Sequence, residues 1–174
     1  TPGVGDACLD EKFYGQFDGK TEENYKEIDA IGGATMTTNG YLFNEELIGK
    51  AAADWNLKKV QITLDGTEEV YNKSKAYIYP EGNPYHIVLE NIGRLLDAGI
   101  PVKIRLNFDL YNAENLLLLV DELADRFAGK EGFSIYGHHL YDITRPSAHI
   151  HSDEGWTKRY DAMHKLEQRI ENRC

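Results

Sequence analysis

Residues 60–77, VQITLDGTEEVYNKSKAY, contain the segment that decides the predicted fold. The run begins with apolar and β-branched side chains, which are typical of a buried strand. It turns polar at Asp65-Gly66, a pair that favours a turn. The residues that follow are charged and predict a loop instead of a helix. We therefore expect a core strand that ends at an aspartate and leads into an irregular, charged segment.

Strand-like runs alternate with helical ones along the rest of the chain. The four predicted strands are Ala34–Thr38, 59–64, 101–109 and 132–142. Four such βα units predict an α/β fold with a parallel sheet, the arrangement of a partial TIM barrel. Residues 1–33 are rich in Gly and acidic residues without a period, so we expect an irregular N-terminal segment before a domain that spans residues 34–174.

The predicted helices carry start and core signals. Asn44, Asn83 and Asn112 each precede a helical run and are expected to cap it, and Pro84 fits the first helical position. The run LLLL at residues 116–119 is apolar on more than one side of its helix, which favours deep burial over a groove for a partner.

Length and charge exclude several classes of protein. With 174 residues the chain fits one domain, and no segment approaches the ~20 apolar residues of a membrane-spanning helix. The formal net charge of −10 disfavours a nucleic-acid partner. The N-terminus lacks the blocks of a secretion signal, so a cytoplasmic location is expected. Cys8 and Cys174 are the only cysteines, so no disulfide framework is expected.

Polar residues gather where the predicted strands end. Because parallel strands joined through helices place their C-terminal ends on one rim, these residues are expected to surround one cavity. Turn formation explains any one of them equally well, since Asn, Asp and Gly are common after strands. The rim residues are Thr37, Thr38, Asn39, Asp65, Asn107, Asp109, His138, His139, Tyr141 and Asp142.

Three quoted stretches carry a resemblance to a known family. TTNGYL at 37–42, QITLDGTEEVYNKSKAY at 61–77 and IRLNFD at 104–109 together resemble the catalytic barrel of radical S-adenosylmethionine (radical SAM) enzymes. The resemblance is to the peptide- and protein-modifying branch, SPASM-type and similar to anaerobic sulfatase-maturating enzymes. It covers about residues 34–142, and the four strands look like the third to sixth strands of that (β/α)6 barrel.

The resemblance implies roles for particular side chains. Lys73 or Lys75 falls where relatives often have an arginine that pairs with a carboxylate, and Arg105 would line the cavity. The alternatives are that Thr63 is only a strand residue, that Asp65 only sets a turn, and that Arg105 pairs with a neighbouring carboxylate. The implied residues for S-adenosylmethionine are Thr38, Asn39, Thr63, Asp65, Asn107, Tyr136 and His138, and those for the peptide substrate are Arg105, Asp109, Tyr141 and Asp142.

The motif that holds the iron–sulfur cluster in that family is absent from this sequence. The family binds a [4Fe-4S] cluster through a CxxxCxxC loop, and this chain has neither that loop nor a GGEP-like turn, because IGGAT at 31–35 lacks the acid and the proline. We therefore expect the chain alone to hold no cluster and to leave S-adenosylmethionine uncleaved. The simplest explanation is a segment of a longer maturase, in which Cys174 resembles the first cysteine of an auxiliary-cluster domain. A short, degenerate relative is the alternative.

Two other readings stay open. His138, His139, His149 and His151 lie close in sequence and suggest a zinc or nickel site, although neighbours on a strand point to opposite faces. A βα half-barrel without chemistry is the second reading, since an open sheet edge invites a peptide or a second copy of the chain.

Overall fold

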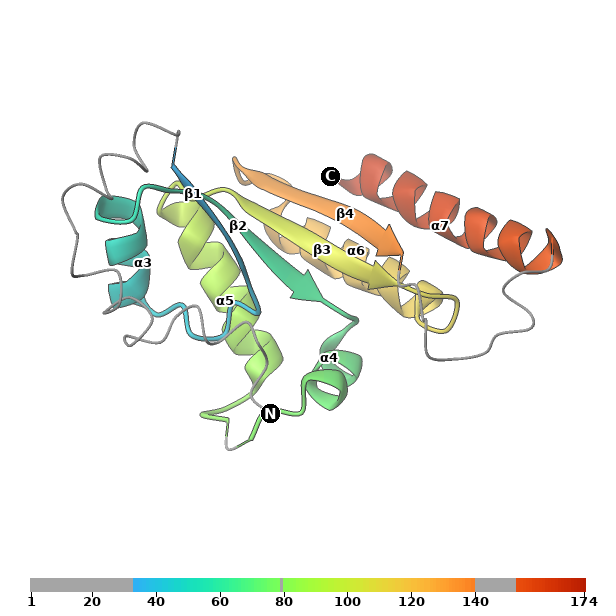
Figure 1. Ribbon diagram of the computed structural model, residues 1–174, viewed down its shortest axis with the longest axis horizontal. Coiled ribbons are helices and arrows are strands. Elements are labelled where there is room, and N and C mark those ends of the chain that lie inside the picture. The colour runs from blue at the N-terminus through green and yellow to red at the C-terminus, as the bar shows by residue number, and fades with distance from the viewer. Residues whose placement is uncertain (1–32, 79, 140–152) are drawn as a thin grey trace.

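The computed structural model describes residues 33–78, 80–139 and 153–174. Its strands form one parallel sheet in the order β1-β2-β3-β4, with helices between them (Figure 1). The predicted α/β fold of successive βα units is confirmed. The strands are β1 Ala34–Thr38, β2 Leu57–Leu64, β3 Val102–Phe108 and β4 Phe133–His139, and the helices are α3 Glu45–Ala53, α4 Glu68–Lys75, α5 Pro84–Asp97, α6 Ala113–Phe127 and α7 Asp153–Arg173.

The predicted N-terminal segment and the end of the fourth strand lie largely outside the described residues. Of residues 1–33 only Gly33 is described, and the predicted strand 132–142 is described up to His139. The division into residues 1–33 and 34–174 therefore stays a prediction.

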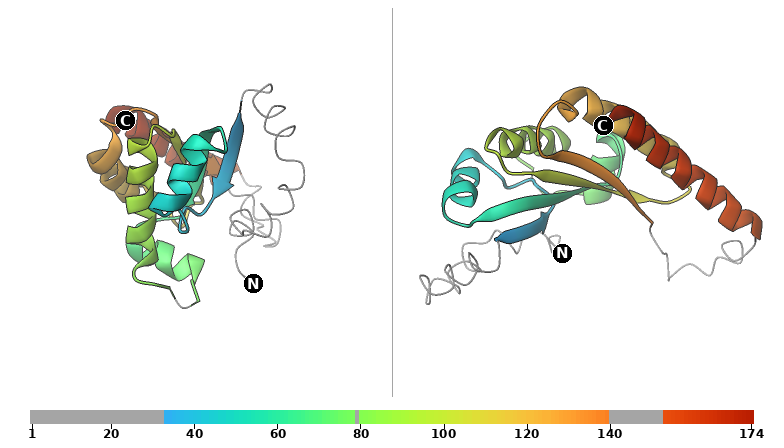
Figure 2. Two further views of the ribbon diagram at one scale, coloured as in Figure 1. Left: turned by 90° about the vertical axis from the view of Figure 1, so that its left-hand side faces the viewer. Right: turned by 90° about the horizontal axis from the view of Figure 1, so that it is seen from above.

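One face of the sheet carries the hydrophobic core. Side chains of β2 and β3 alternate between buried and partly exposed, as expected for strands covered on one face. Helices α3, α5, α6 and α7 lie on the same side of the sheet, which the view from above shows (Figure 2). The fully buried strand residues of this face are Val60, Ile62, Leu64, Val102, Ile104 and Leu106.

The predicted helix starts are correct in position, and two of the three are correct in mechanism. The Asn44 side chain accepts a hydrogen bond from the backbone N–H of Leu47, and Asn83 accepts one from Tyr85, with Pro84 in the first turn. Asn112 stands at the start of α6, but its side chain makes no capping bond. Its amide oxygen instead accepts from the backbone N–H of Asp109, so it orders the turn before the helix.

The predicted charged loop after Gly66 is wrong, because residues Glu68–Lys75 form the short helix α4. Its charges suit a helix, with Glu68 and Glu69 in the first turn and Lys73 and Lys75 in the last, each complementing the helix dipole. Tyr71 is fully buried and anchors α4. Tertiary packing therefore stabilises a segment too short to be helical alone.

The apolar run at 116–119 is mostly core, as predicted. Leu116 and Leu119 are fully buried, whereas Leu118 is 62% exposed. Helix α7 packs against β4 at Gly137, where an added Cβ would lie 2.6 Å from the Met163 side chain. No helix in the described part of the chain is long and apolar enough to cross a membrane.

Candidate functional site on the open face of the sheet

The second face of the sheet is polar, and we call it the open face. The described helices α3, α5, α6 and α7 lie on the other side of the sheet (Figure 2). The open face is formed by the side chains that alternate with the core residues, and register places Thr63, Arg105 and Tyr136 in one row across three strands. The remaining strand residues of this face are Thr35, Thr37, Lys59, Gln61, Lys103, Asn107, Ser134 and His138.

A chain of polar contacts runs across the C-terminal ends of β2 and β3. Arg105 donates from Nε to the Oδ1 atom of Asn107 at 3.1 Å, and Asn107 donates from Nδ2 to Asp65 Oδ1 at 2.8 Å. The second carboxylate oxygen of Asp65 lies 2.8 Å from the Nζ atom of Lys75 in α4. The two sequence-predicted residues Asp65 and Asn107 thus meet, and Lys75 joins them.

Lys73 and Lys75 are the two candidates for the position at which the resemblance places an arginine, and in this structure Lys75 pairs with a carboxylate of the protein itself. Both side chains of the Lys75–Asp65 pair are only about a quarter exposed, at 26% and 22%. Lys73 is exposed. Within the described residues Arg105 forms no ion pair, so the carboxylate partner considered for it from sequence is not seen there; its partner is the Asn107 amide.

The turn after Asp65 is held by a residue that the sequence analysis missed. Asn115 in α6 accepts a hydrogen bond from the backbone N–H of Thr67 at 2.9 Å and donates one to the Thr67 hydroxyl at 2.9 Å. A Cβ at Gly66 would meet the Asn115 amide oxygen and the Val70 side chain, so only glycine fits this close approach without movement. Long-range contacts of this kind, 48 residues apart in sequence, leave no local signal.

Tyr136 lies across the open face and connects the two sides of β3. Its hydroxyl donates to Oε1 of Gln61 in β2 at 2.9 Å, although Tyr136 belongs to β4. The ammonium group of Lys103, from the intervening strand, lies 4.4 Å from the centre of the Tyr136 ring. This is within the range of a cation–π contact. The predicted residue Tyr136 is therefore fixed beside basic side chains, and Gln61 and Lys103 are contacts that sequence reasoning did not single out.

Thr63 and His138 lie on the open face beside these contacts. Thr63 stands next to Arg105 in the parallel register, and His138 stands next to Asn107. His138 is exposed and Thr63 is partly exposed. The predicted role of each in cofactor binding stays a prediction.

Three other predicted residues act as turn formers. Thr38 is buried, and its hydroxyl accepts from the backbone N–H of Gly40 at 3.2 Å. Asn39 accepts from Tyr41 at 2.9 Å. The Asp109 carboxylate accepts from two backbone N–H groups, those of Tyr111 at 2.7 Å and Asn112 at 2.8 Å. These bonds supply a structural reason for each residue type, and no contact tests their predicted ligand-binding roles.

The histidine group is divided by the strand. His138 shares the open face with Asn107, whereas the His139 ring meets Phe108 edge-on at 5.3 Å between centroids. His149 and His151 lie outside the described residues, as do Tyr141 and Asp142. In the residues that the structure describes, no group of three or more His, Cys, Asp and Glu side chains converges as a metal site.

Burial raises the pKa of two titratable groups away from the open face. Burial, together with a hydrogen bond from its hydroxyl to Glu122 at 2.8 Å, raises the pKa of Tyr85 well above its usual range. Partial burial raises the pKa of the Cys174 thiol at the end of α7, and Arg173 opposes this shift. Within the described residues Cys174 is a free thiol, and its predicted role as an auxiliary-cluster ligand stays a prediction.

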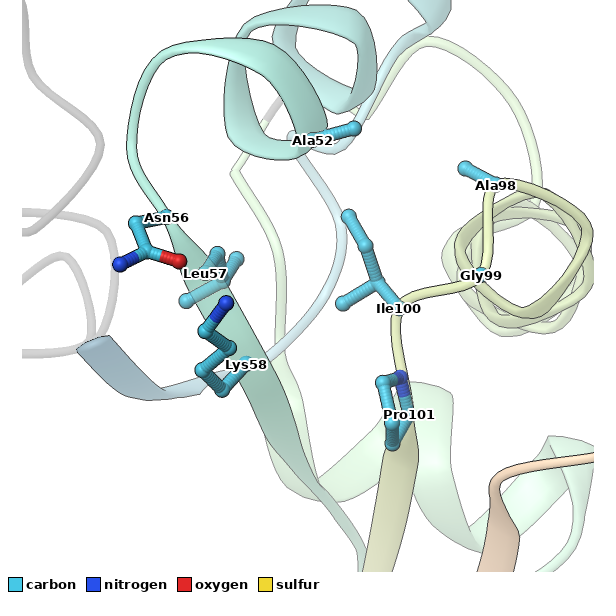
Figure 3. Close-up of a pocket in the computed structure, with 8 residues that line it drawn as sticks. All are labelled: Ala52, Asn56, Leu57, Lys58, Ala98, Gly99, Ile100 and Pro101. Atoms are coloured by element: carbon cyan, nitrogen blue, oxygen red, sulfur yellow. The ribbon is translucent and has the colours of Figure 1, made fainter. Parts of the chain in front are cut away.

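A hollow lies at the opposite end of the sheet, where β2 and β3 begin. Figure 3 shows that it is lined by the ends of α3 and α5 and by the first residues of the two strands. Asn56 and Lys58 are its polar side chains, and the other lining residues are Ala52, Leu57, Ala98, Gly99, Ile100 and Pro101. None of the predicted site residues lies there.

The comparisons with known proteins assign no family. No protein-family model matches the chain, and no curated protein matches it. Among solved structures, SuiB of Streptococcus suis bound to S-adenosylmethionine matches at 14% identity and a TM-score of 0.47, over 78% of this chain and 29% of that chain. A second SuiB structure matches at 15% identity and a TM-score of 0.43, over 63% and 23%. The chain thus spans less than a third of these proteins, and at such TM-scores the likeness supports no assignment.

Proposed function

We propose that this chain is a segment of a radical SAM peptide or protein maturase and that its open face contributes to binding S-adenosylmethionine and the peptide substrate. The observation that carries the proposal is the contact chain Lys75–Asp65–Asn107–Arg105 at the C-terminal ends of adjacent parallel strands. Ligands of parallel α/β sheets bind at this end of the strands. The sequence resemblance supplies the identity of the ligand.

The residues present suit the organic cofactor in their chemistry. The ribose hydroxyl groups need acceptors, which Asp65 and Asn107 offer, and a carboxylate of the peptide substrate needs a cation, which Arg105 offers in bidentate form. Arg105 donates only its Nε atom to Asn107, so its two terminal nitrogen atoms have no partner within the described residues. Tyr136 supplies an aromatic surface beside this row.

The residues present do not suit the iron–sulfur cluster. A site-differentiated [4Fe-4S] cluster needs three thiolates, and the whole sequence contains two cysteines, Cys8 and Cys174. Bound elsewhere in a complete enzyme, the cluster supplies the electron for reductive cleavage of the cofactor. We propose no such step for this chain, whose part is binding and positioning. A cytoplasmic location and a peptide partner belong to the same proposal.

The binding claim is tested with the chain itself. Isothermal titration calorimetry with S-adenosylmethionine is expected to give saturable binding that Asp65→Asn and Asn107→Ala weaken. Asp161→Asn, which makes the same charge change on the exposed face of α7, is the matched control and is expected to bind like the wild type. No binding by the wild type, or equal loss in the control, contradicts the proposal.

The catalytic claim is tested with the complete reading frame that encodes this segment. A CxxxCxxC motif upstream and formation of 5′-deoxyadenosine after anaerobic reconstitution with iron and sulfide are expected. A complete frame without the three cysteines rules the maturase out.

A non-catalytic half-barrel is the second candidate, and the sheet edges favour it. Within the described residues β1 pairs only with β2, and β4 pairs only with β3, so each outer strand has one partner. Unpaired edge groups accept a further strand from a peptide or from a second copy of the chain. Analytical ultracentrifugation tests whether a second copy of the chain occupies these edges. A strictly monomeric, folded sample would exclude self-association.

A further inference from the structure

The open face is basic, although the chain as a whole is acidic. The formal net charge of the sequence is −10. The strands nevertheless place Lys59, Lys103 and Arg105 on the open face, and no strand position of that face holds an acidic residue. Asp65, just past β2, is neutralised by its ion pair with Lys75. The strand positions of this face therefore carry three positive charges, opposite in sign to the whole, and the Asp109 carboxylate just past β3 is held by the backbone N–H groups of Tyr111 and Asn112.

Two of these cations are available to a ligand. Within the described residues neither Lys103 nor Arg105 lies within ion-pair distance of a carboxylate; their contacts are the Tyr136 ring and the Asn107 amide oxygen. Both side chains are partly exposed. A cation that is fixed by neutral neighbours keeps its charge uncompensated, so it favours an anionic ligand.

The spacing of Lys103 and Arg105 matches that of an extended peptide. They are alternate residues of β3, so their Cα atoms lie about 6.6 Å apart along the strand. An extended peptide laid along β3 repeats its side chains on one side at the same interval. Two acidic side chains at positions i and i+2 would face Lys103 and Arg105 together, whereas acidic neighbours at i and i+1 would point to opposite sides.

From this charge and spacing we infer that the peptide substrate of this face is an extended segment with acidic side chains at alternate positions. The inference rests on the proposed function, because it names the substrate class of the same site. A long nucleic acid matches the cations in sign, but the net charge of −10 repels its phosphate backbone. A short acidic segment meets the local positive charge without that penalty, since screening limits repulsion to about 8–10 Å.

Fluorescence anisotropy with rhodamine-labelled peptides tests the inference. Three peptides of equal length are used, with two glutamates at alternate positions, with the same glutamates adjacent, and with two glutamines. The alternate peptide is expected to bind most tightly, with an affinity that falls as salt is raised. Lys103→Gln combined with Arg105→Gln is expected to weaken it roughly two- to thirtyfold. Lys165→Gln on α7 is the matched control and is expected to bind like the wild type.

Three results would overturn the inference. They are equal affinity for the alternate and adjacent peptides, equal loss in the Lys165→Gln control, and displacement of the peptide by an RNA oligonucleotide at equivalent charge concentration. Urea midpoints of each variant show that the comparison is made on folded protein. Calorimetry with S-adenosylmethionine on the same samples separates the two proposals. Cofactor binding without peptide preference overturns only this inference, and peptide preference without cofactor binding overturns only the cofactor role.

Discussion

The two faces of the sheet differ in chemistry although they alternate residue by residue along the same strands. In β3, Ile104 and Leu106 are fully buried under helices, whereas Lys103 and Arg105, which alternate with them, are partly exposed. The covered face consists of apolar side chains that pack in the core, whereas the open face consists of charged and hydrogen-bonding side chains. Because the side-chain period of a strand is two, a substitution one position along tests the other face.

This separation assigns stability to one face and recognition to the other. Burial of apolar area stabilises the fold by about 25 cal/mol per Å², and that area lies on the covered face. Exposed polar contacts contribute much less each, about 0–1 kcal/mol. Variants on the open face are therefore expected to change binding while leaving the fold intact, and the predictions below test this division.

The largest effect is expected on the covered face. Leu106→Ala removes a fully buried side chain from the centre of β3 and is expected to lower the free energy of unfolding by about 2–5 kcal/mol. Lys103→Ala, three positions earlier and on the open face, is expected to change it by about 0.5 kcal/mol or less. Urea denaturation measures both. Similar losses for the two variants would show that the open face is packed and contradict the division.

A second effect concerns the turn between β2 and α4. Gly66→Ala places a Cβ against Asn115 and Val70 and is expected to destabilise by about 1–3 kcal/mol. Gly49→Ala in α3 meets nothing within 4 Å and is expected to stabilise by about 0.5–1 kcal/mol, since alanine favours a helix. The pair is measured by thermal and urea unfolding. If Gly66→Ala were neutral, the clamp by Asn115 would not restrain this turn.

A third effect is a dependence on pH that originates under the covered face. The pKa of Tyr85 is raised in the folded state above its ordinary value of about 10, so the folded protein keeps a proton that the unfolded chain loses. The stabilisation that the protonated Tyr85 gives the folded state is complete below pH ~10. It is lost as the pH rises from there toward the raised pKa, by up to about 1.4 kcal/mol per pH unit. Tyr85→Phe is expected to make this alkaline slope shallower in unfolding curves taken between pH 9 and 11. Equal slopes in both proteins would contradict the shift.

The covered face and the strand order were predictable from sequence because their signals are local. The β-branched run of β2, the caps Asn44 and Asn83, and Pro84 each act within a few residues, and the structure agrees with them. Helix α4 was not predicted because its sequence is mostly charged and polar, and Tyr71 is its one fully buried side chain. Burial of that ring depends on partners such as Tyr85, which lies 5.7 Å away between ring centroids and 14 positions later.

The open face was predictable in its residues but not in its contacts. Asp65 and Asn107 were singled out because they stand where strands end, and Arg105 was singled out through the family resemblance; the three do lie together. Lys75, Gln61 and Asn115 complete the arrangement through pairings 10, 75 and 48 residues apart in sequence. Such pairings follow from strand register and from the packing of the helices, which a single sequence does not specify.

The smallest effect decides whether Asp65 serves the fold or a ligand. A double-mutant cycle with Asp65→Asn and Lys75→Met isolates the ion pair from the Asn107 contact, which both cycle arms retain. A coupling energy of about 0.5–1 kcal/mol, falling as salt rises, is expected for a pair in which about a quarter of each side chain remains exposed to solvent. If the coupling is present, Lys75 restrains the Asp65 carboxylate. Lys75→Met is then expected to free this carboxylate and to alter the affinity for S-adenosylmethionine. Lys73→Met, on the exposed side of α4, is the control and is expected to leave that affinity unchanged. Zero coupling at low salt would show that Lys75 does not stabilise the Asp65 carboxylate. The ion pair would then not explain the lysine at position 75.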